Sequence, residues 1–308
     1  MYRFWLLAGG AGLVSAVVFL IGVSGSQSGI MLAYLAPAPL FAAALALGRG
    51  AGVVAAALGA IPVMMAAGMP AGLAYAVVAA APAAVLGHLA MLSRTDEQGT
   101  VEWYPSGALT SWLCCVGLVA LIVFCGLLAR EPAGLAGAVA ELTIEFSDWL
   151  QVKEKDLFVS VFQPVLPGVA VASWMLLLVV NGALAQGLLV AVKWAGRPSP
   201  DVGALMLPRW IAIVGALAAL AAILLGGDYA YFARNMLIVM AVPYFLQGLS
   251  VMHVLARKIS GDSMVLAMFY VTLLVVGWAV VPLILIVLLG LVEQVAGLRR
   301  RITKENQT

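Results

Sequence analysis

The sequence predicts an all-α polytopic membrane protein, folded as a transmembrane bundle of nine or ten helices. Of its 308 residues, 64% are hydrophobic and only 10% are charged, whereas a soluble domain is about a quarter charged. Apolar runs of roughly 20 residues, enough for a helix to cross a bilayer, follow one another along the chain. Their ends carry most of the charges, as in membrane proteins. This composition excludes soluble, secreted and disordered proteins and makes the lipid bilayer the expected partner.

The first half of the chain contains five predicted membrane helices. They span about 4–24, 30–47, 51–66, 71–92 and 107–128. Pro37 and Pro39 remove two backbone donors from the second of these helices and predict a break in it. Such a break is tolerated only where protein or a cavity covers the freed carbonyl groups. The third helix is almost entirely Gly, Ala and Val, which predicts close helix packing.

Residues 129–164 form the longest polar segment and contain one amphipathic helix, expected to lie flat at the outer interface. Its apolar and acidic residues recur at helical spacing on opposite faces: Val139, Leu142, Phe146, Trp149 and Leu150 against Glu141, Glu145 and Asp148. A lid over an outer opening is the alternative interpretation.

The second half adds helices over about 166–193 and 209–226 and a third over 234–258. The last apolar run, residues 264–297, would measure about 51 Å as one helix. Because the hydrocarbon core is about 30 Å thick, this run is either one tilted helix or two helices that turn near Val281–Pro282. With two helices, the predicted inner side carries twelve Lys and Arg residues and the outer side four. One helix would make the split even, so the positive-inside rule favours ten crossings with both termini in the cytoplasm. We expect one transmembrane domain over residues 1–298 and a basic polar tail over 299–308.

The sequence gives no argument for an enzyme, a cofactor or a metal site. It contains no GxxxxGK[ST], HExxH, CxxC or GxSxG motif, so it carries no ATPase of its own and no catalytic residue is assigned. The small net charge of +2 gives no reason to expect a nucleic-acid partner. Cys114, Cys115 and Cys125 share one apolar span and are expected to be packing residues rather than disulfide partners.

Polar residues within the membrane are the remaining candidates for a site, because they are costly there and need partners. We expect Asn181, Gln186, Tyr244 and Gln247 to line a solute site, with Arg234 at its mouth. In the simpler alternative the amides only link helices and Arg234 extends to the lipid headgroups.

Two segments resemble the YybS-like family of bacterial integral membrane proteins of unknown function. They are Gln247-Gly248-Leu249-Ser250, which leads into Arg257-Lys258, and Gly290-Leu291-Val292-Glu293, which is followed by Arg299. The resemblance implies a multi-pass protein of the bacterial inner membrane.

Residues 30–92 are similar to the membrane-embedded substrate-binding subunits of energy-coupling-factor vitamin transporters. The similarity rests on Pro37-Ala38-Pro39, Gly48-Arg49-Gly50-Ala51-Gly52 and Gly87-His88. Those proteins bind a vitamin or a metal and rely on a separate ATPase. This chain has more helices than their usual six.

The sequence therefore favours membrane transport or small-solute binding without an ATPase of its own. The alternative is a membrane scaffold that assembles or anchors a complex. A small-molecule solute is the expected partner in the first case, and a cytoplasmic or membrane protein in the second.

Overall fold

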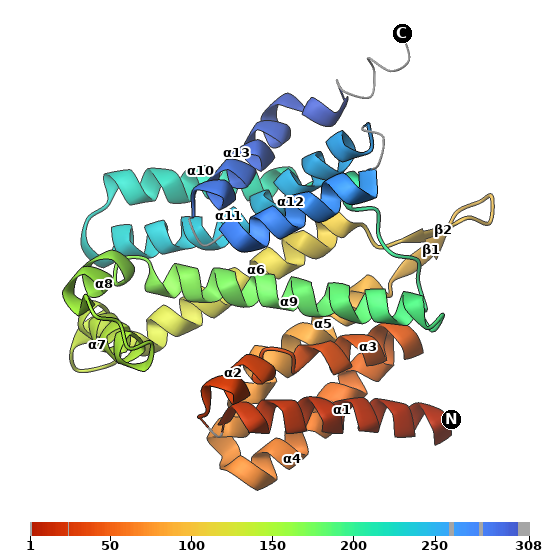
Figure 1. Cartoon of the computed structure of the whole chain (residues 1–308), viewed down its shortest axis with the longest axis horizontal. Coiled ribbons are helices and arrows are strands. Elements are labelled where there is room, and N and C mark those ends of the chain that lie inside the picture. The colour runs from red at the N-terminus through yellow and green to blue at the C-terminus, as the bar shows by residue number, and fades with distance from the viewer. Residues whose placement is uncertain (1, 24, 259–261, 277–279, 301–308) are drawn as a thin grey trace. The chain divides into compact units, whose positions relative to one another are not determined.

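The computed structural model describes residues 2–23, 25–258, 262–276 and 280–300, which are almost entirely helical (Figure 1). Six helices in these ranges are long and apolar enough to cross a membrane. This confirms the prediction of an all-α polytopic protein. The chain divides into two compact units. The first unit comprises Met1–Pro105 and Leu176–Pro200, and the second comprises Ser106–Met175 and Asp201–Thr308. A single domain over residues 1–298 stays a prediction.

The first unit contains most of the Gly- and Ala-rich helices. Its elements are α1 (Tyr2–Val23), α2 (Gln27–Ala33), α3 (Pro37–Leu47), α4 (Arg49–Tyr75), the π-helix η1 (Ala76–Ala80), α5 (Ala81–Ala90), the antiparallel strands β1 (Ser93–Thr95) and β2 (Val101–Trp103), and the later part of α9 (Leu166–Ala191). Glycines allow α1 and α4 to pack closely, since a Cβ on Gly12 would lie 2.3 Å from the carbonyl oxygen of Ala55. The close packing predicted from small residues is thus present.

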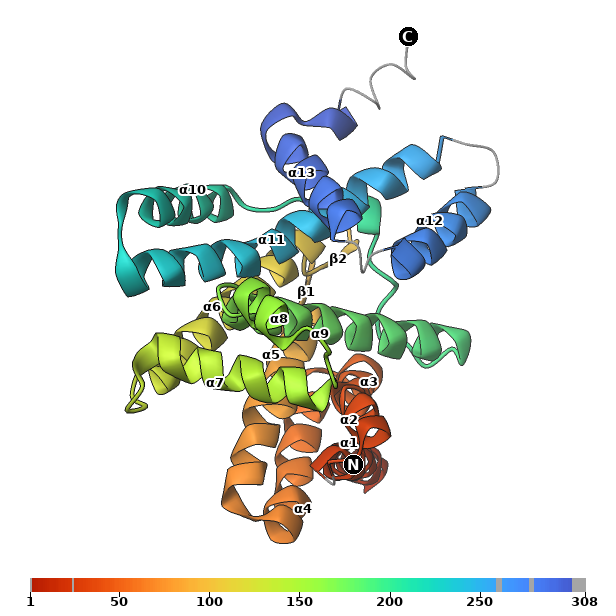
Figure 2. The ribbon, with the colours of Figure 1, turned by 60° about the vertical axis from the view of Figure 1, so that its left-hand side comes forward.

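The long helical run over 49–90 is interrupted at Gly68. Gly68 adopts φ 84° and ψ 174°, a conformation that glycine reaches without a steric penalty. Pro70 follows two residues later and cannot donate a backbone hydrogen bond. Figure 2 shows the chain reversing direction within α4 (orange). The run therefore forms two helical segments, in agreement with the predicted helices 51–66 and 71–92.

The second unit contains the remaining helices. They are α6 (Ser106–Leu128), α7 (Gly134–Trp149), α8 (Lys155–Phe162), the first part of α9, the 3₁₀ turn η2 (Val202–Ala204), α10 (Arg209–Leu224), α11 (Gly227–Ala256), α12 (Asp262–Val276) and α13 (Val281–Ala296). Its buried core includes Cys114, Leu205, Leu207, Ile211, Met240 and Tyr244. α11 packs against α6, α10 and α13, so it is the central helix of this unit.

The last apolar run forms two helices, α12 and α13, and not one tilted helix. α13 begins at Val281 with Pro282 in its first turn, where proline costs no hydrogen bond. Each helix would be about 23 Å long at 1.5 Å per residue. Residues 277–279, between the two helices, lie outside the described residues. The two-helix alternative is therefore the one present.

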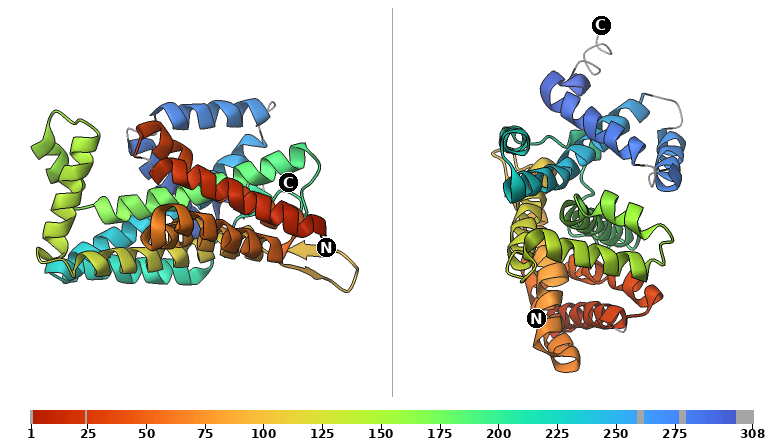
Figure 3. Two further views of the ribbon diagram at one scale, coloured as in Figure 1. Left: turned by 90° about the horizontal axis from the view of Figure 1, so that it is seen from below. Right: turned by 90° about the vertical axis from the view of Figure 1, so that its left-hand side faces the viewer.

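The predicted amphipathic helix is present as α7, and α8 folds back beside it (Figure 3, left, yellow-green). Its predicted apolar stripe is divided. Val139 is fully buried, whereas Phe146 and Trp149 are each 40% exposed. These two rings stack on each other, and the ring centre of Phe158 in α8 lies 6.1 Å from that of Phe146. Aromatic side chains of this kind are enriched at membrane interfaces. The interfacial position of α7, and the alternative that it forms a lid, both stay predictions.

Candidate functional site

The predicted break in the second membrane helix lies between α2 and α3, at residues 34–36. Side chains from other helices satisfy the carbonyl groups at the break. The carbonyl oxygen of Tyr34 accepts a hydrogen bond from Nδ2 of Asn181 at 2.9 Å. That of Ala36 accepts one from Oγ of Ser15 at 2.6 Å, and the Tyr75 hydroxyl donates to the same Oγ at 2.8 Å. Protein groups therefore cover these two carbonyl groups, which is one of the two predicted alternatives.

Asn181 is fully buried, and only the NH₂ group of its side-chain amide has hydrogen-bond partners. Its Nδ2 also donates to the carbonyl oxygen of Leu177 at 2.8 Å. Because both partners are carbonyl oxygens, the NH₂ end must face them, and this fixes the orientation of the amide. Its Oδ1 has no hydrogen-bond partner. A buried acceptor left unpaired costs about 1–3 kcal/mol, so Asn181 offers an open acceptor beside the helix break.

Gln186 repeats this pattern five residues further along α9. Its side chain is 7% exposed, and its Nε2 donates to the carbonyl oxygen of Arg197 at 3.0 Å. Its Oε1 has no partner. Both sequence-predicted residues on α9 therefore present a buried and unpaired carbonyl oxygen within the first unit.

In the second unit, α11 and α13 cross with their backbones in close contact. A Cβ on Gly248 would lie 2.0 Å from the carbonyl oxygen of Ile286, and one on Gly290 would lie 1.9 Å from that of Tyr244. Only glycine fits at either position. The two segments that carry the YybS-like resemblance, Gln247–Ser250 and Gly290–Glu293, therefore contact each other.

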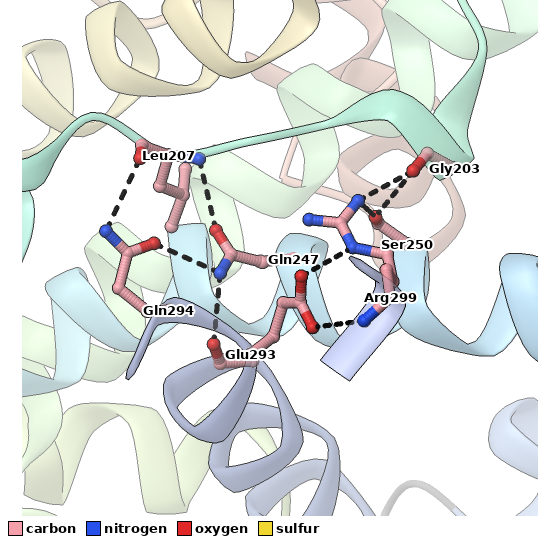
Figure 4. A network of polar contacts seen from close by, with 8 residues as sticks. Gly203, Leu207, Gln247, Ser250, Glu293, Gln294 and Arg299 are labelled. Carbon is pink, nitrogen blue, oxygen red and sulfur yellow. Dashed lines mark hydrogen bonds and ion pairs between the residues drawn. The ribbon is translucent and has the colours of Figure 1, made fainter. Parts of the chain in front are cut away.

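Gln247 lies at this crossing and is 2% exposed. Its Nε2 donates to the carbonyl oxygen of Gly290 at 3.2 Å and to Oε1 of Gln294 at 3.1 Å. Its Oε1 accepts from the backbone N–H of Leu207 at 3.1 Å (Figure 4). Both ends of the amide are used within the protein. Gln247 thus joins α11, α13 and the segment before α10.

A buried ion pair continues this network. Nε of Arg299 lies 2.8 Å from Oε1 of Glu293, and the two side chains are 10% and 5% exposed. Arg299 Nη1 also donates to the Ser250 hydroxyl and, at 2.6 Å, to the carbonyl oxygen of Gly203 (Figure 4). We use the name α11–α13 clamp for Gly203, Leu207, Gln247, Ser250, Gly290, Glu293, Gln294 and Arg299.

Comparison with known proteins identifies the family. A family model described as "Predicted membrane protein (DUF2232)" matches residues 13–292. The chain belongs to this family. No curated protein and no solved structure matches the chain.

The remaining predicted site residues of this DUF2232 protein lie on α11. Tyr244 is 5% exposed and packs in the apolar core of the second unit. Arg234 is exposed. Asn181 and Gln186 belong to the first unit, and Arg234, Tyr244 and Gln247 to the second.

Asn235 is a polar residue of this DUF2232 protein that sequence reasoning did not assign to the site. It is fully buried. Its Nδ2 donates to the carbonyl oxygens of Pro164 and Tyr231 at 3.1 and 3.0 Å, and its Oδ1 accepts from Gly168 N–H at 2.8 Å. Asn235 therefore binds the start of α9 to α11. The sequence signal that could have identified Asn235 is its polar amide within an apolar helix.

Arg299 and Glu293 were also absent from the predicted site. The sequence predicted that Arg299 belongs to the polar tail, yet it is buried against Glu293. Residues 301–308 of that tail lie outside the described residues. An acidic residue within an apolar run was the signal for Glu293.

In the parts of the chain that the structure describes, no three His, Cys, Asp or Glu side chains gather as a metal site. Cys114, Cys115 and Cys125 are free thiols.

Proposed function

We propose that this DUF2232 protein binds a small polar solute in the membrane and transports it without an ATPase of its own. The supporting observation is the pair of unpaired carbonyl oxygens on α9, at Asn181 and Gln186. Buried polar atoms of native proteins nearly always have a partner. A bound solute would supply one.

The chemistry of the two oxygens restricts the solute. Amide carbonyl oxygens accept hydrogen bonds and cannot donate them. A solute that binds here must therefore carry hydrogen-bond donors, such as hydroxyl, amide or ammonium groups.

The broken helix supports the same proposal. In membrane proteins, irregular backbone at membrane depth is tolerated where it is buried in protein or lines a cavity, and substrate sites of transporters are typically built at discontinuous helices. Asn181 lies at such a break, because its Nδ2 binds the carbonyl oxygen of Tyr34.

A scaffold is the second candidate function, and the α11–α13 clamp favours it. Both ends of the Gln247 amide are engaged within the chain, so this residue links helices and leaves nothing for a solute. On this proposal, Tyr244 and Gln247 hold the second unit together, and Arg234 extends to the headgroups. The partner would be a cytoplasmic or membrane protein, and no catalytic role is proposed in either case.

The finer family relationships and the location are also proposals. The YybS-like resemblance and a location in a bacterial inner membrane are proposed from the sequence alone. The similarity to substrate-binding subunits of energy-coupling-factor transporters is likewise proposed from the sequence alone. The charge distribution favours a cytoplasmic location for both termini.

Native mass spectrometry of the protein purified in a mild detergent tests the proposal. We expect a co-purified small molecule in the wild type and its loss in Asn181→Leu and in Gln186→Leu. Gln98→Leu, which replaces an exposed amide in the β1–β2 loop, is the matched control and should retain the molecule. Retention of the same molecule in both α9 variants would contradict a solute site on α9. A wild type free of small molecules but bound to another protein would favour the scaffold.

A further inference from the structure

Arg197 is a buried cation in the loop that follows α9. Its side chain is 7% exposed. Burial lowers the pKa of its guanidinium from the ordinary value, because the charged form loses hydration. Arginine nevertheless remains charged in proteins. A buried charge of this kind is costly unless it is paired.

The contacts of Arg197 are all with neutral groups. Its Nη1 donates to the carbonyl oxygen of Ala90 at 2.5 Å, and its Nε donates to that of Pro198 at 3.4 Å. The guanidinium carbon lies 5.4 Å from the centre of the Trp103 ring, a cation–π distance. Ala90 is the last residue of α5, where the helix dipole favours a cation. These contacts hold the guanidinium in place but do not neutralise it.

Two acidic residues of the first unit, Asp96 and Glu102, have partners other than Arg197. Glu102 forms an ion pair with Arg94 at 2.6 Å. Asp96 accepts from the backbone N–H groups of Gln98 and Thr100. Within the described ranges, no carboxylate forms an ion pair with Arg197. The charge therefore lacks a counter-ion there.

The guanidinium also retains hydrogen-bonding capacity. It has five N–H donors in a planar fork, and two of them are used by the carbonyl oxygens of Ala90 and Pro198. The backbone around it is fixed at two points. Gly196 N–H donates to the carbonyl oxygen of Leu45 at 2.8 Å, and Gln186 binds the carbonyl oxygen of Arg197. The loop thus presents a positioned, partly unused guanidinium.

We infer that Arg197 binds an anionic phosphate group, such as the headgroup phosphate of a membrane lipid. The planar fork of Arg matches the oxygen geometry of phosphate. Basic pockets beside membrane helices are known binding sites for anionic headgroups, and Trp103 is of the residue type that lies at headgroup level. This site is separate from the solute role and does not depend on it.

Thermal unfolding of the full chain in a phosphate-free detergent tests the site. Phosphatidylglycerol is compared with an uncharged glycolipid that has the same acyl chains. Inorganic phosphate is compared with chloride at equal ionic strength. A ligand that binds only the folded protein raises its melting temperature. We expect phosphatidylglycerol to raise the melting temperature of the wild type more than the glycolipid does. If inorganic phosphate alone gives the same rise, the ligand is a free phosphate rather than a lipid.

Three variants identify Arg197 as the residue responsible. Arg197→Gln should lose the response. Lys193→Gln, which removes an exposed cation from the same loop, should respond like the wild type. Arg197→Lys keeps the charge but not the fork, and its apparent affinity should fall roughly tenfold; this variant decides the question if Arg197→Gln does not fold. An unresponsive wild type, a full response in Arg197→Gln, or equal affinity in Arg197→Lys would overturn the assignment.

Discussion

Glu293 and Arg299 form a buried ion pair, with Oε1 and Nε 2.8 Å apart, that connects α13 to α11. Arg299 reaches the Ser250 hydroxyl on α11 and the carbonyl oxygen of Gly203 before α10. The backbone N–H of Arg299 also donates to Oε2 of Glu293 at 3.1 Å. The carboxylate therefore has partners at both oxygens, as a buried charge requires.

Removal of either partner of this ion pair should strongly destabilise the protein. Breaking a buried pair leaves an uncompensated charge and costs about 3–5 kcal/mol. We expect this loss in Glu293→Gln and in Arg299→Gln, measured as the free energy of unfolding in detergent. The double variant Glu293→Leu/Arg299→Leu leaves no isolated charge and should be more stable than the sum of the single losses implies. Single variants within 0.5 kcal/mol of the wild type, on the order of a surface change, would exclude a structural role for the pair.

Alanine at either glycine of the helix crossing should separate α11 from α13. A Cβ would lie about 2 Å from a carbonyl oxygen at Gly248 and at Gly290, too close for any adjustment of a side chain to relieve. Overpacking of this kind costs typically 1–3 kcal/mol. Gly126→Ala is the control, since Gly126 of α6 has no neighbour within 4 Å of its Cβ position. The melting temperatures in detergent should fall for Gly248→Ala and Gly290→Ala and stay the same for Gly126→Ala. Equal behaviour of the three variants would show that the crossing tolerates a methyl group.

Hydropathy and proline positions predicted the membrane helices, because both act locally. Pro37 and Pro39 remove donors wherever the chain lies, so the break between α2 and α3 follows from the sequence. The length of the last apolar run allowed one helix or two, and the distribution of Lys and Arg favoured two. These predictions depend on which residues can form a helix and not on which helices meet.

Contacts between distant segments could not be predicted in this way. Hydropathy shows that Gln247 lies in a membrane helix, but not that Gly290 and Gln294 lie opposite it. A cluster of arginines after an apolar run usually reports topology, so Arg299 was assigned to the tail. Its burial depends on Glu293, six residues earlier, and on a loop from before α10. Likewise, a sequence cannot show which end of the Asn181 amide remains unpaired.

The substitution Gln247→Leu should destabilise the second unit. It leaves the backbone N–H of Leu207 and the carbonyl oxygen of Gly290 without their partner. An unpaired buried polar group costs about 1–3 kcal/mol. Gln98→Leu, at an exposed position, should change the free energy of unfolding little. If Gln247→Leu instead unfolds like the wild type, water or rearranged neighbours must satisfy both groups.

The ion pair between Asp201 and Arg257 should contribute a small, pH-dependent stability. Hydrogen bonding from Arg257 holds the pKa of Asp201 below its ordinary value of 3.8. Because the folded-state pKa is the lower one, the contribution is complete above pH 3.8 and is lost as the pH falls through the lowered value. Both side chains are 50% exposed, so the pair is worth at most about 1 kcal/mol. The difference in melting temperature between the wild type and Asp201→Asn should vanish in this acidic range. A difference that persists unchanged below the lowered pKa would assign it to another interaction.

Chemical labelling should show which side of the membrane each loop faces. The charge distribution predicts that the loop at Arg94 faces the cytoplasm and the loop at Arg130 faces outward, and both residues are exposed. In a background with Cys114, Cys115 and Cys125 replaced by Ala, one new cysteine is introduced as Arg94→Cys or Arg130→Cys. A membrane-impermeant maleimide should label Arg130→Cys in intact spheroplasts and Arg94→Cys only after permeabilisation. The reverse pattern would invert the topology, and labelling of both variants in intact spheroplasts would mean that these loops lie on the same side. In that second case the number of crossings between Arg94 and Arg130 would be even, and α6 alone could not account for it.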